Sequence, residues 1–258
     1  MRKLALRDEI LLQIDKAARY IGGEVNAVMK NKDDVDIRFA MAFPDVYEIG
    51  MSNLGMMILY DMFNKRDDVW CERLFSPWTD LDKIMREEHI PLFTLESQDP
   101  VKEFDFLGIT LGYEMCYTNV LQLLDLSGIP LLAKERTEDD PLVIGGGACA
   151  YNPEPLAPFF DLFYIGEGEI RYDALFDLYK EMKQSGTYTR EAFLRAAAQI
   201  PGIYVPSLYD VSYKEDGTIA AITPRFSDVP KTVKRQVLVN MDEGAYPTKP
   251  LVPFVRAT

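Results

Sequence analysis

Two short apolar runs that each end in a cluster of glycines constrain this chain more than any other feature. The first is residues 141–150, with the sequence PLVIGGGACA, and the second is residues 161–169, with the sequence DLFYIGEGE. Uninterrupted runs of Leu, Val, Ile, Phe and Tyr bounded by glycine are typical of parallel strands that helices cover on both faces. Each run is therefore predicted to be a buried strand that opens into a glycine-rich loop.

Further extended runs alternate with helical patterns along residues 35–200. The extended runs are expected at residues 37–43, 69–75, 92–95 and 104–111, and the helices at residues 46–64, 80–88, 112–126, 170–184 and 190–199. Asp45 is placed to cap the helix that follows it. Strands that alternate with helices form α/β sheets with right-handed crossovers. The predicted fold is a Rossmann- or flavodoxin-like, doubly wound, mainly parallel sheet.

The two ends of the chain have different patterns. An amphipathic helix is expected over residues 6–20, so residues 1–34 form a helical and extended lead-in. Two extended runs, residues 204–213 and 218–223, flank an Asp-Gly turn and predict a β-hairpin. The chain then becomes extended and proline-punctuated, and its apolar end at residues 251–258 suggests a piece of a longer protein. We expect three parts, residues 1–34, 35–200 and 201–258.

Charge and hydropathy exclude several classes of function. The 41 acidic and 28 basic residues give a formal charge of −13, which disfavours direct binding to nucleic acid or to anionic membranes. No apolar run approaches the ~18 residues that span a bilayer, and the first 30 residues hold no signal-peptide core. A cytoplasmic protein without a membrane partner is expected.

Cysteine and histidine offer little for metal chemistry. The three cysteines, Cys71, Cys116 and Cys149, have spacings that match neither a zinc nor an iron–sulfur motif, and free thiols fit a reducing compartment. Each is most simply a small core residue. The single histidine, His89, lies in a charged stretch and is expected at the surface. No metal ligands and no catalytic residues are therefore predicted within this chain.

The strand ends hold the candidate ligand contacts, because doubly wound sheets bind ligands at the carboxyl ends of their strands. Gly145, Gly146 and Gly147 are not followed by Lys-Ser/Thr, and no Gly-x-Gly-x-x-Gly follows the first strand, so nucleoside triphosphate and NAD sites are disfavoured. The three glycines suit either close approach of a ligand or a tight turn that lets a helix pack closely.

Two further loops carry polar groups at strand ends. Gly166-Glu167-Gly168-Glu169 places two carboxylates where they could cap a helix or accept hydrogen bonds from a ligand. Tyr113, Glu114, Tyr117 and Asn119 are suited to orienting a ligand, and they form no recognisable acid–base pair. The sequence therefore predicts binding rather than catalysis at this edge.

At these residues the chain resembles the N-terminal region of a family of radical S-adenosylmethionine proteins that carry a cobalamin-binding domain. The resemblance covers about residues 15–258. It is carried by residues 18–24 (ARYIGGE), 43–55 (FPDVYEIGMSNLG), 71–78 (CERLFSPW), 113–119 (YEMCYTN) and 152–155 (NPEP), together with the two glycine loops.

The resemblance implies a second, catalytic domain in the parent protein. In that family a barrel with a Cys-x3-Cys-x2-Cys motif binds a [4Fe-4S] cluster that cleaves S-adenosylmethionine. No such cysteine triplet occurs in this chain. The implied partner is thus the barrel of the same parent chain, and this chain alone is expected to generate no radicals.

The resemblance also implies cobalamin as the ligand. Many cobalamin domains supply a histidine to cobalt from Asp-x-His-x-x-Gly after the first strand, whereas residues 44–50 here read PDVYEIG. Cobalt would therefore lack a histidine ligand from this loop. The corrin is expected over Pro44, Asp45, Tyr47, Gly50, Tyr113, Glu114 and Tyr117, and the nucleotide tail near Gly145, Gly146, Gly147, Gly166, Glu167, Gly168 and Glu169.

Two other functions remain open at this point. The chain could be a degenerate Rossmann-like domain that binds no cofactor and docks to the barrel through its acidic surface and residues 201–258. It could also be a free-standing nucleotide or flavin binder with a flavodoxin-like fold.

Overall fold

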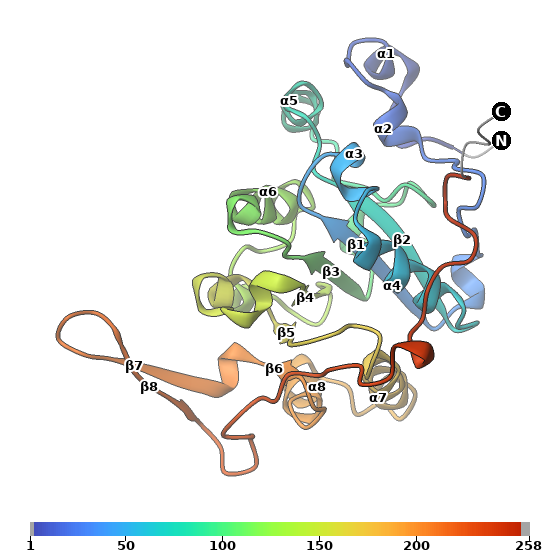
Figure 1. Ribbon diagram of the computed structural model, residues 1–258. Helices are drawn as coiled ribbons and strands as arrows, with labels where there is room; N and C mark the ends of the chain where they lie inside the picture. The colour runs from blue at the N-terminus through green and yellow to red at the C-terminus, as the bar shows by residue number, and fades with distance from the viewer. Residues whose placement is uncertain (1–2, 254–258) are drawn as a thin grey trace.

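The computed structural model describes residues 3–253 and contains one six-stranded sheet and a separate hairpin (Figure 1). The strand order is β2-β1-β3-β4-β5-β6, in which the first five are parallel and β6 is antiparallel to β5. The order 2-1-3-4-5 is that of flavodoxin-like folds. The predicted fold class is confirmed. The strands are β1 (Ile37–Phe43), β2 (Val69–Phe75), β3 (Phe106–Thr110), β4 (Leu142–Gly146), β5 (Leu162–Tyr164) and β6 (Ile203–Tyr204).

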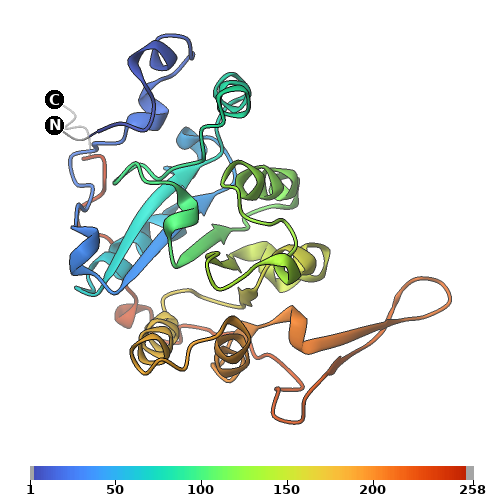
Figure 2. The same cartoon turned by 180° about the vertical axis from the view of Figure 1, so that it is seen from behind.

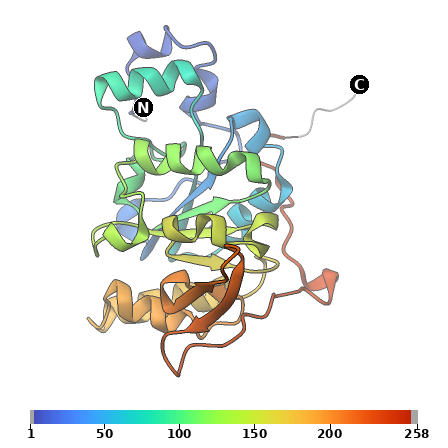
Figure 3. The same ribbon diagram turned by 90° about the vertical axis from the view of Figure 1, so that its left-hand side faces the viewer.

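Helices cover both faces of the sheet (Figures 2 and 3). The helices are α1 (Asp8–Leu11), α2 (Ala18–Ile21), α3 (Tyr47–Gly50), α4 (Leu54–Asn64), α5 (Thr79–Glu88), α6 (Tyr117–Leu126), α7 (Tyr172–Gln184) and α8 (Arg190–Ala197). Rings from α4, α7 and α8 pack on Phe39 and Phe106 of the sheet, so these three helices share one face. On the opposite face α5 and α6 lie together, and Gln122 of α6 donates to Asp82 of α5 at 2.9 Å.

Every residue of β1 and of β2 is buried, as expected for strands covered on both sides. The two strands pair over their whole length, from Ile37 with Val69 to Phe43 with Phe75. β1 is a central strand and β2 is the edge strand, and both are buried because each side chain, up or down, meets a helix or loop. The carboxyl ends of β1, β3 and β4 consequently lie along one edge.

Some expected elements are divided in the structure. The helix expected at residues 6–20 is two short helices, because the backbone N–H of Asp15 donates to Asp80 at 2.8 Å instead of continuing the helix. The helix expected at residues 46–64 breaks into α3 and α4. Asn53 caps α4 by accepting from the N–H of Met56 at 2.9 Å, and Asp45 caps neither helix, so the cap expected there was wrong.

Two expected strands also differ. Residues 92–95 form no strand and make a single bridge, between Phe93 and Pro100. The run at residues 204–213 divides into β6 and β7 (Tyr209–Tyr213), because Pro206 opens a short 3-10 turn between them. The predicted hairpin is present, with β8 (Ile219–Pro224) antiparallel to β7, and it projects away from the sheet (Figure 1).

The N-terminal lead-in is attached to the edge strand β2 through buried charges. Glu24 accepts from the guanidinium of Arg73 at 2.6 Å and from the hydroxyl of Tyr47 at 2.8 Å. The Arg73 side chain is wholly buried. This part of the chain is therefore fixed to the sheet although it contributes no strand.

The segment at residues 233–251, called here the C-terminal strap, runs back from the hairpin across the domain (red in Figure 1). Gln236 pairs with Gly166 as a parallel bridge, and at the far end the N–H of Asn26 donates to the carbonyl of Leu251 at 3.2 Å. The strap thus connects the loop after β5 with the N-terminal lead-in. Most of the expected extended terminus at residues 251–258 lies outside the described residues.

None of the helices within residues 3–253 is both long enough and apolar enough to cross a bilayer.

Candidate ligand-binding site

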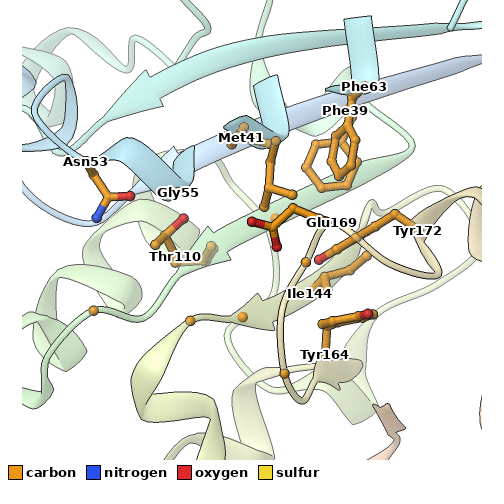
Figure 4. Close-up of a pocket in the computed structure, with 18 of the residues that line it drawn as sticks. Phe39, Met41, Asn53, Gly55, Phe63, Thr110, Ile144, Tyr164, Glu169 and Tyr172 are labelled. Atoms are coloured by element: carbon orange, nitrogen blue, oxygen red, sulfur yellow. The ribbon is translucent and has the colours of Figure 1, made fainter. Parts of the chain in front are cut away.

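A cavity of about 360 Å³ opens at the carboxyl edge of the sheet (Figure 4). It lies between the ends of β1, β3 and β4, helix α4 and the loop at residues 165–169. In the strand order 2-1-3-4-5, β1 and β3 flank the topological switch point, where doubly wound sheets bind ligands. The cavity also falls within the size range of small-molecule sites.

Glycines are frequent in the lining, and two of them, Gly112 and Gly146, leave open space where a side chain would stand. Seven of the lining residues are glycines: Gly55, Gly108, Gly112, Gly146, Gly147, Gly166 and Gly168. A Cβ added to Gly146 would enter the cavity, with the Tyr172 hydroxyl as its nearest neighbour at 3.9 Å. A Cβ at Gly112 would meet nothing within 4 Å. The backbone of β4 and of the loop after β3 is therefore open to close approach by a ligand.

Aromatic rings form the deep wall of the cavity. The centroid of the Tyr172 ring lies 4.8 Å from the centroid of the Phe63 ring. The Tyr172 ring is stacked on the Tyr164 ring, with 4.9 Å between their centroids. Phe39 meets Tyr172 edge-on at 6.4 Å, and Met41 and Ile144 complete the apolar lining. Flat apolar walls of this kind suit a planar aromatic group.

Four polar side chains face this apolar space: Asn53, Thr110, Glu169 and Tyr172 (Figure 4). The side-chain oxygen of Asn53 is occupied by the α4 cap. Burial raises the pKa of both Tyr172 and Tyr164, so both hydroxyls stay protonated at neutral pH. The Tyr164 hydroxyl donates to the carbonyl of Ile170. The lining can therefore position a ligand through a few directed hydrogen bonds.

Five of the residues expected at the ligand line the cavity: Gly146, Gly147, Gly166, Gly168 and Glu169. Gly147 has φ +97°, and a Cβ there would lie 2.9 Å from the carbonyl oxygen of Leu111. Its lack of a side chain is thus required by the turn itself, and the tight-turn interpretation applies to Gly147.

Gly145 and Glu167 point elsewhere. A Cβ on Gly145 would lie 2.6 Å from the ring of Phe163, on the opposite side of the strand from the cavity. Glu167 is exposed and accepts a hydrogen bond from the backbone N–H of Leu238 in the C-terminal strap. The strap also explains Gly166, because a Cβ there would collide with the backbone of Gln236.

The residues expected beneath a corrin form a second group on the adjoining loops. Tyr113 donates to Asp45, and the hydrogen bond to this carboxylate raises the pKa of Tyr113 to about 12. The carbonyl of Pro44 accepts from the side-chain amide of Asn119 at 2.9 Å. These bonds join the loop after β1 to the loop after β3 and to helix α6. Exposed Glu114 lies between Tyr113 and α6, and half-buried Tyr117 is the first residue of α6.

Tyr47 and Gly50 face the domain interior. Besides its bond to Glu24, the Tyr47 ring packs edge-on against Phe75 at 5.4 Å, and burial raises its pKa to about 12. A Cβ on Gly50 would overlap the same Phe75 ring. The structure therefore places these two residues beside the end of β2 and not in the cavity lining.

Sequence reasoning did not identify the deep wall of the cavity or the α4 side of its mouth. Gly108 was the available signal in β3, since a glycine inside a strand often marks close approach of another group. Its missing side chain makes room for the Phe39 ring. Asn53 and Gly55 belong to the motif at residues 43–55, but only the structure shows that Asn53 caps α4 and that both residues lie at the mouth of the cavity.

No group of three or more His, Cys, Asp or Glu side chains that could hold a metal ion occurs within residues 3–253. His89 ends helix α5 in the left-handed conformation and is not among the residues that line the cavity. The lining therefore suits an organic ligand with an apolar, planar part.

The family described as radical SAM proteins, N-terminal, matches residues 55–206, which is more than half of the chain. The chain belongs to this family. The matched residues include β2 to β6 and all seven of the glycines that line the cavity. The resemblance stated from the motifs is confirmed at the level of the radical SAM family.

One curated relative is an uncharacterised protein of Methanocaldococcus jannaschii, 26% identical over 154 residues, which are 58% of this chain and 28% of the relative. Two solved structures are also similar. The cobalamin-dependent S-adenosylmethionine radical enzyme OxsB is 15% identical, with 76% of this chain and 24% of that chain covered and a TM-score of 0.40.

The second structure is the radical S-adenosylmethionine methyltransferase TsrM from Kitasatospora setae, solved with cobalamin and a [4Fe-4S] cluster bound. It is 13% identical, with 84% of this chain and 32% of that chain covered and a TM-score of 0.41. The chain spans between about a quarter and a third of the length of these three proteins.

Proposed function

We propose that this chain is the corrinoid-binding module of a radical S-adenosylmethionine protein. In this proposal the cavity takes the nucleotide tail of cobalamin, and the loops after β1 and β3 lie beneath the corrin. The observation that carries the proposal is the glycine-lined cavity at the β1/β3 switch point of a chain that belongs to a radical SAM family.

The lining fits the tail of a corrinoid. Its lower base is planar and aromatic, and the deep wall consists of the Phe39, Phe63, Tyr164 and Tyr172 rings. Gly146 leaves the backbone bare where the tail would pass. A side chain at this position would fill the space that the tail needs.

Three exposed, large apolar side chains stand within three residues of cavity-lining residues in the sequence. Leu54 at the start of α4 is 65% exposed, Met115 after β3 is 87% exposed and Tyr151 after β4 is 54% exposed. In this proposal the segments that carry these side chains, after β1, β3 and β4, lie against the apolar face of the macrocycle. These segments would shield one face of the corrin from water.

When bound, a corrinoid supplies a cobalt centre that can carry an alkyl group or an electron. The residues of this chain bind and orient the ring and exclude water. The only histidine in the sequence is His89. The proposal therefore has cobalt without an imidazole ligand from the loop at residues 44–50.

The domain division follows as part of the proposal. Residues 35–200 form the corrinoid-binding part, residues 1–34 support it, and residues 201–258 lead toward a radical SAM barrel of the same parent chain. That barrel, and not this chain, would hold the [4Fe-4S] cluster and S-adenosylmethionine. Free Cys71, Cys116 and Cys149 fit a reducing, cytoplasmic setting.

The test is to titrate this chain and its full-length parent protein with hydroxocobalamin. Equilibrium dialysis and visible spectra measure how much corrinoid each protein binds. We expect saturable uptake of one corrinoid per chain, and at least tenfold weaker uptake by Gly146→Val with unchanged circular dichroism. Ala221→Val, which enlarges an exposed residue of β8, is the control and should bind like the parent sequence.

Folded full-length protein that takes up no corrinoid would contradict the proposal and leave the docking domain as the function. A flavin or nucleotide that copurifies and is lost in Gly146→Val would instead establish the third alternative.

A further inference from the structure

One tyrosine hydroxyl that borders the cavity differs from those of the other buried tyrosines. Seven tyrosines are buried in the part of the chain that the structure describes: Tyr20, Tyr60, Tyr164, Tyr172, Tyr179, Tyr204 and Tyr209. The hydroxyls of the other six are hydrogen-bonded to protein groups. The Tyr172 hydroxyl makes no hydrogen bond with any residue from 3 to 253, although Tyr172 is only 6% exposed. Its capacity to donate and accept a hydrogen bond is therefore available to a group inside the cavity.

The position of this hydroxyl suits such a group. It lies 3.9 Å from where a Cβ on Gly146 would stand, which is inside the cavity, and Figure 4 shows the oxygen directed into that space. The ring is held between Phe63 and Tyr164, at 4.8 Å and 4.9 Å, so it has no room to turn toward another partner. The hydroxyl is therefore fixed in advance for a group that enters the cavity.

The chemistry of that group follows from its surroundings. The walls around the hydroxyl are the flat faces and edges of aromatic rings, which suit a planar aromatic guest. Because burial raises its pKa, the Tyr172 hydroxyl keeps its proton and can donate. A planar ring with a hydrogen-bond acceptor on its edge satisfies both requirements.

We propose that Tyr172 is a specificity-determining residue that donates a hydrogen bond to the ring nitrogen of a benzimidazole-type lower base. This inference rests on the proposed function and states which corrinoids the site prefers. Corrinoids with a phenolic lower base, which has no ring nitrogen, bind more weakly.

The experiment measures the dissociation constants of full-length protein for two probes, cobalamin and p-cresolylcobamide, by equilibrium dialysis. Tyr172→Phe removes one oxygen and keeps the ring. We expect it to weaken cobalamin about three- to tenfold, as loss of one hydrogen bond does, and to change p-cresolylcobamide less than about twofold. The parent sequence should prefer cobalamin, and Tyr172→Phe should remove most of that preference.

Tyr179→Phe is the matched control, because Tyr179 is a buried tyrosine of the same helix outside the cavity lining, and its hydroxyl donates to Asp105 at 2.7 Å. It should keep the preference for cobalamin even where it lowers stability. Equal weakening of both probes by Tyr172→Phe would assign only packing to the ring, and an unchanged cobalamin affinity would also overturn the inference. Failure of the parent sequence to bind either probe would refute the proposed function itself, which is a different result.

Discussion

Arg73 of β2 and Glu96 of the loop before β3 form an ion pair from which water is excluded. Both side chains are 0% exposed, and the Nε of Arg73 lies 2.7 Å from Oε1 of Glu96. Glu24 of the N-terminal lead-in meets the other end of the same guanidinium. One arginine therefore joins three segments that are distant in the sequence.

Replacement of Arg73 is expected to destabilise the domain strongly. Arg73→Met would remove the guanidinium that pairs with the buried carboxylates of Glu24 and Glu96, and breaking a buried ion pair in this way costs about 3–5 kcal/mol in the free energy of unfolding. The control is Lys83→Ala, which removes the exposed partner of Glu87 and should cost less than about 1 kcal/mol. Urea denaturation followed by circular dichroism measures both. A loss for Arg73→Met no larger than that of the control would show that the buried pair contributes little.

Stability is expected to depend on pH through Glu24. Burial raises the pKa of Glu24, but the hydrogen bond and charge of Arg73 outweigh it and hold the pKa below the ordinary value of 4.5. A carboxyl whose pKa is lower in the folded state stabilises the fold fully above its unfolded pKa, and that contribution is lost as the pH falls through the folded pKa. The stability advantage over Glu24→Gln should therefore be largest above pH ~5 and shrink below pH ~4.5. Unfolding free energies of the two proteins between pH 3 and 7 decide this, and a constant difference would contradict it.

Replacement of two glycines near the cavity by alanine is expected to change stability by different amounts. In Gly108→Ala the new methyl group would overlap the Phe39 ring, so we expect a loss of about 1–3 kcal/mol. In Gly112→Ala the methyl group meets nothing within 4 Å, and stability should change by less than about 1 kcal/mol. Thermal and urea unfolding of the pair provide the measurement. Equal losses would mean that Phe39 does not occupy the space above Gly108.

Gly166→Ala is expected to release the C-terminal strap. Gly166 has φ +123°, and a Cβ there would collide with the backbone of Gln236. Gly186→Ala is the matched control, since Gly186 has φ +69° with nothing within 4 Å of its Cβ position. Limited trypsin digestion should cleave at Lys234 and Arg235 faster in Gly166→Ala than in Gly186→Ala. Identical cleavage rates would show that the strap does not depend on this contact.

The parallel strands of the sheet could be predicted from the sequence, whereas the exact limits of several helices and strands around them could not. Apolar runs such as residues 142–144 identify buried strands because every side chain on them is covered. By contrast, residues 204–213 look like one strand, and only the packing around Pro206 divides them into β6 and β7. The break between α1 and α2 likewise depends on Asp80, which is distant in the sequence.

The candidate site could be located only in part, for a similar reason. Glycines after β4 and β5 indicated the correct edge of the sheet, because doubly wound sheets bind ligands at the carboxyl ends of their strands. The deep wall could not be inferred, since Phe39, Phe63 and Tyr172 are ordinary core residues by type and come from three separate elements. Their common direction into one cavity is a property of the tertiary structure.

The projecting hairpin of β7 and β8 has a mechanical consequence. Its base is fastened where Tyr209 packs on Tyr204 at 5.1 Å and donates to the carbonyl of Pro230 at 2.7 Å, whereas residues 214–223 are all exposed. A two-stranded ribbon without a covered face is marginally stable in water, so it opens from its free end while the sheet stays intact. Protection of its amide hydrogens against exchange with deuterated solvent should therefore decrease from Tyr209 toward Gly217, and a protein surface that covers the ribbon would remove this gradient.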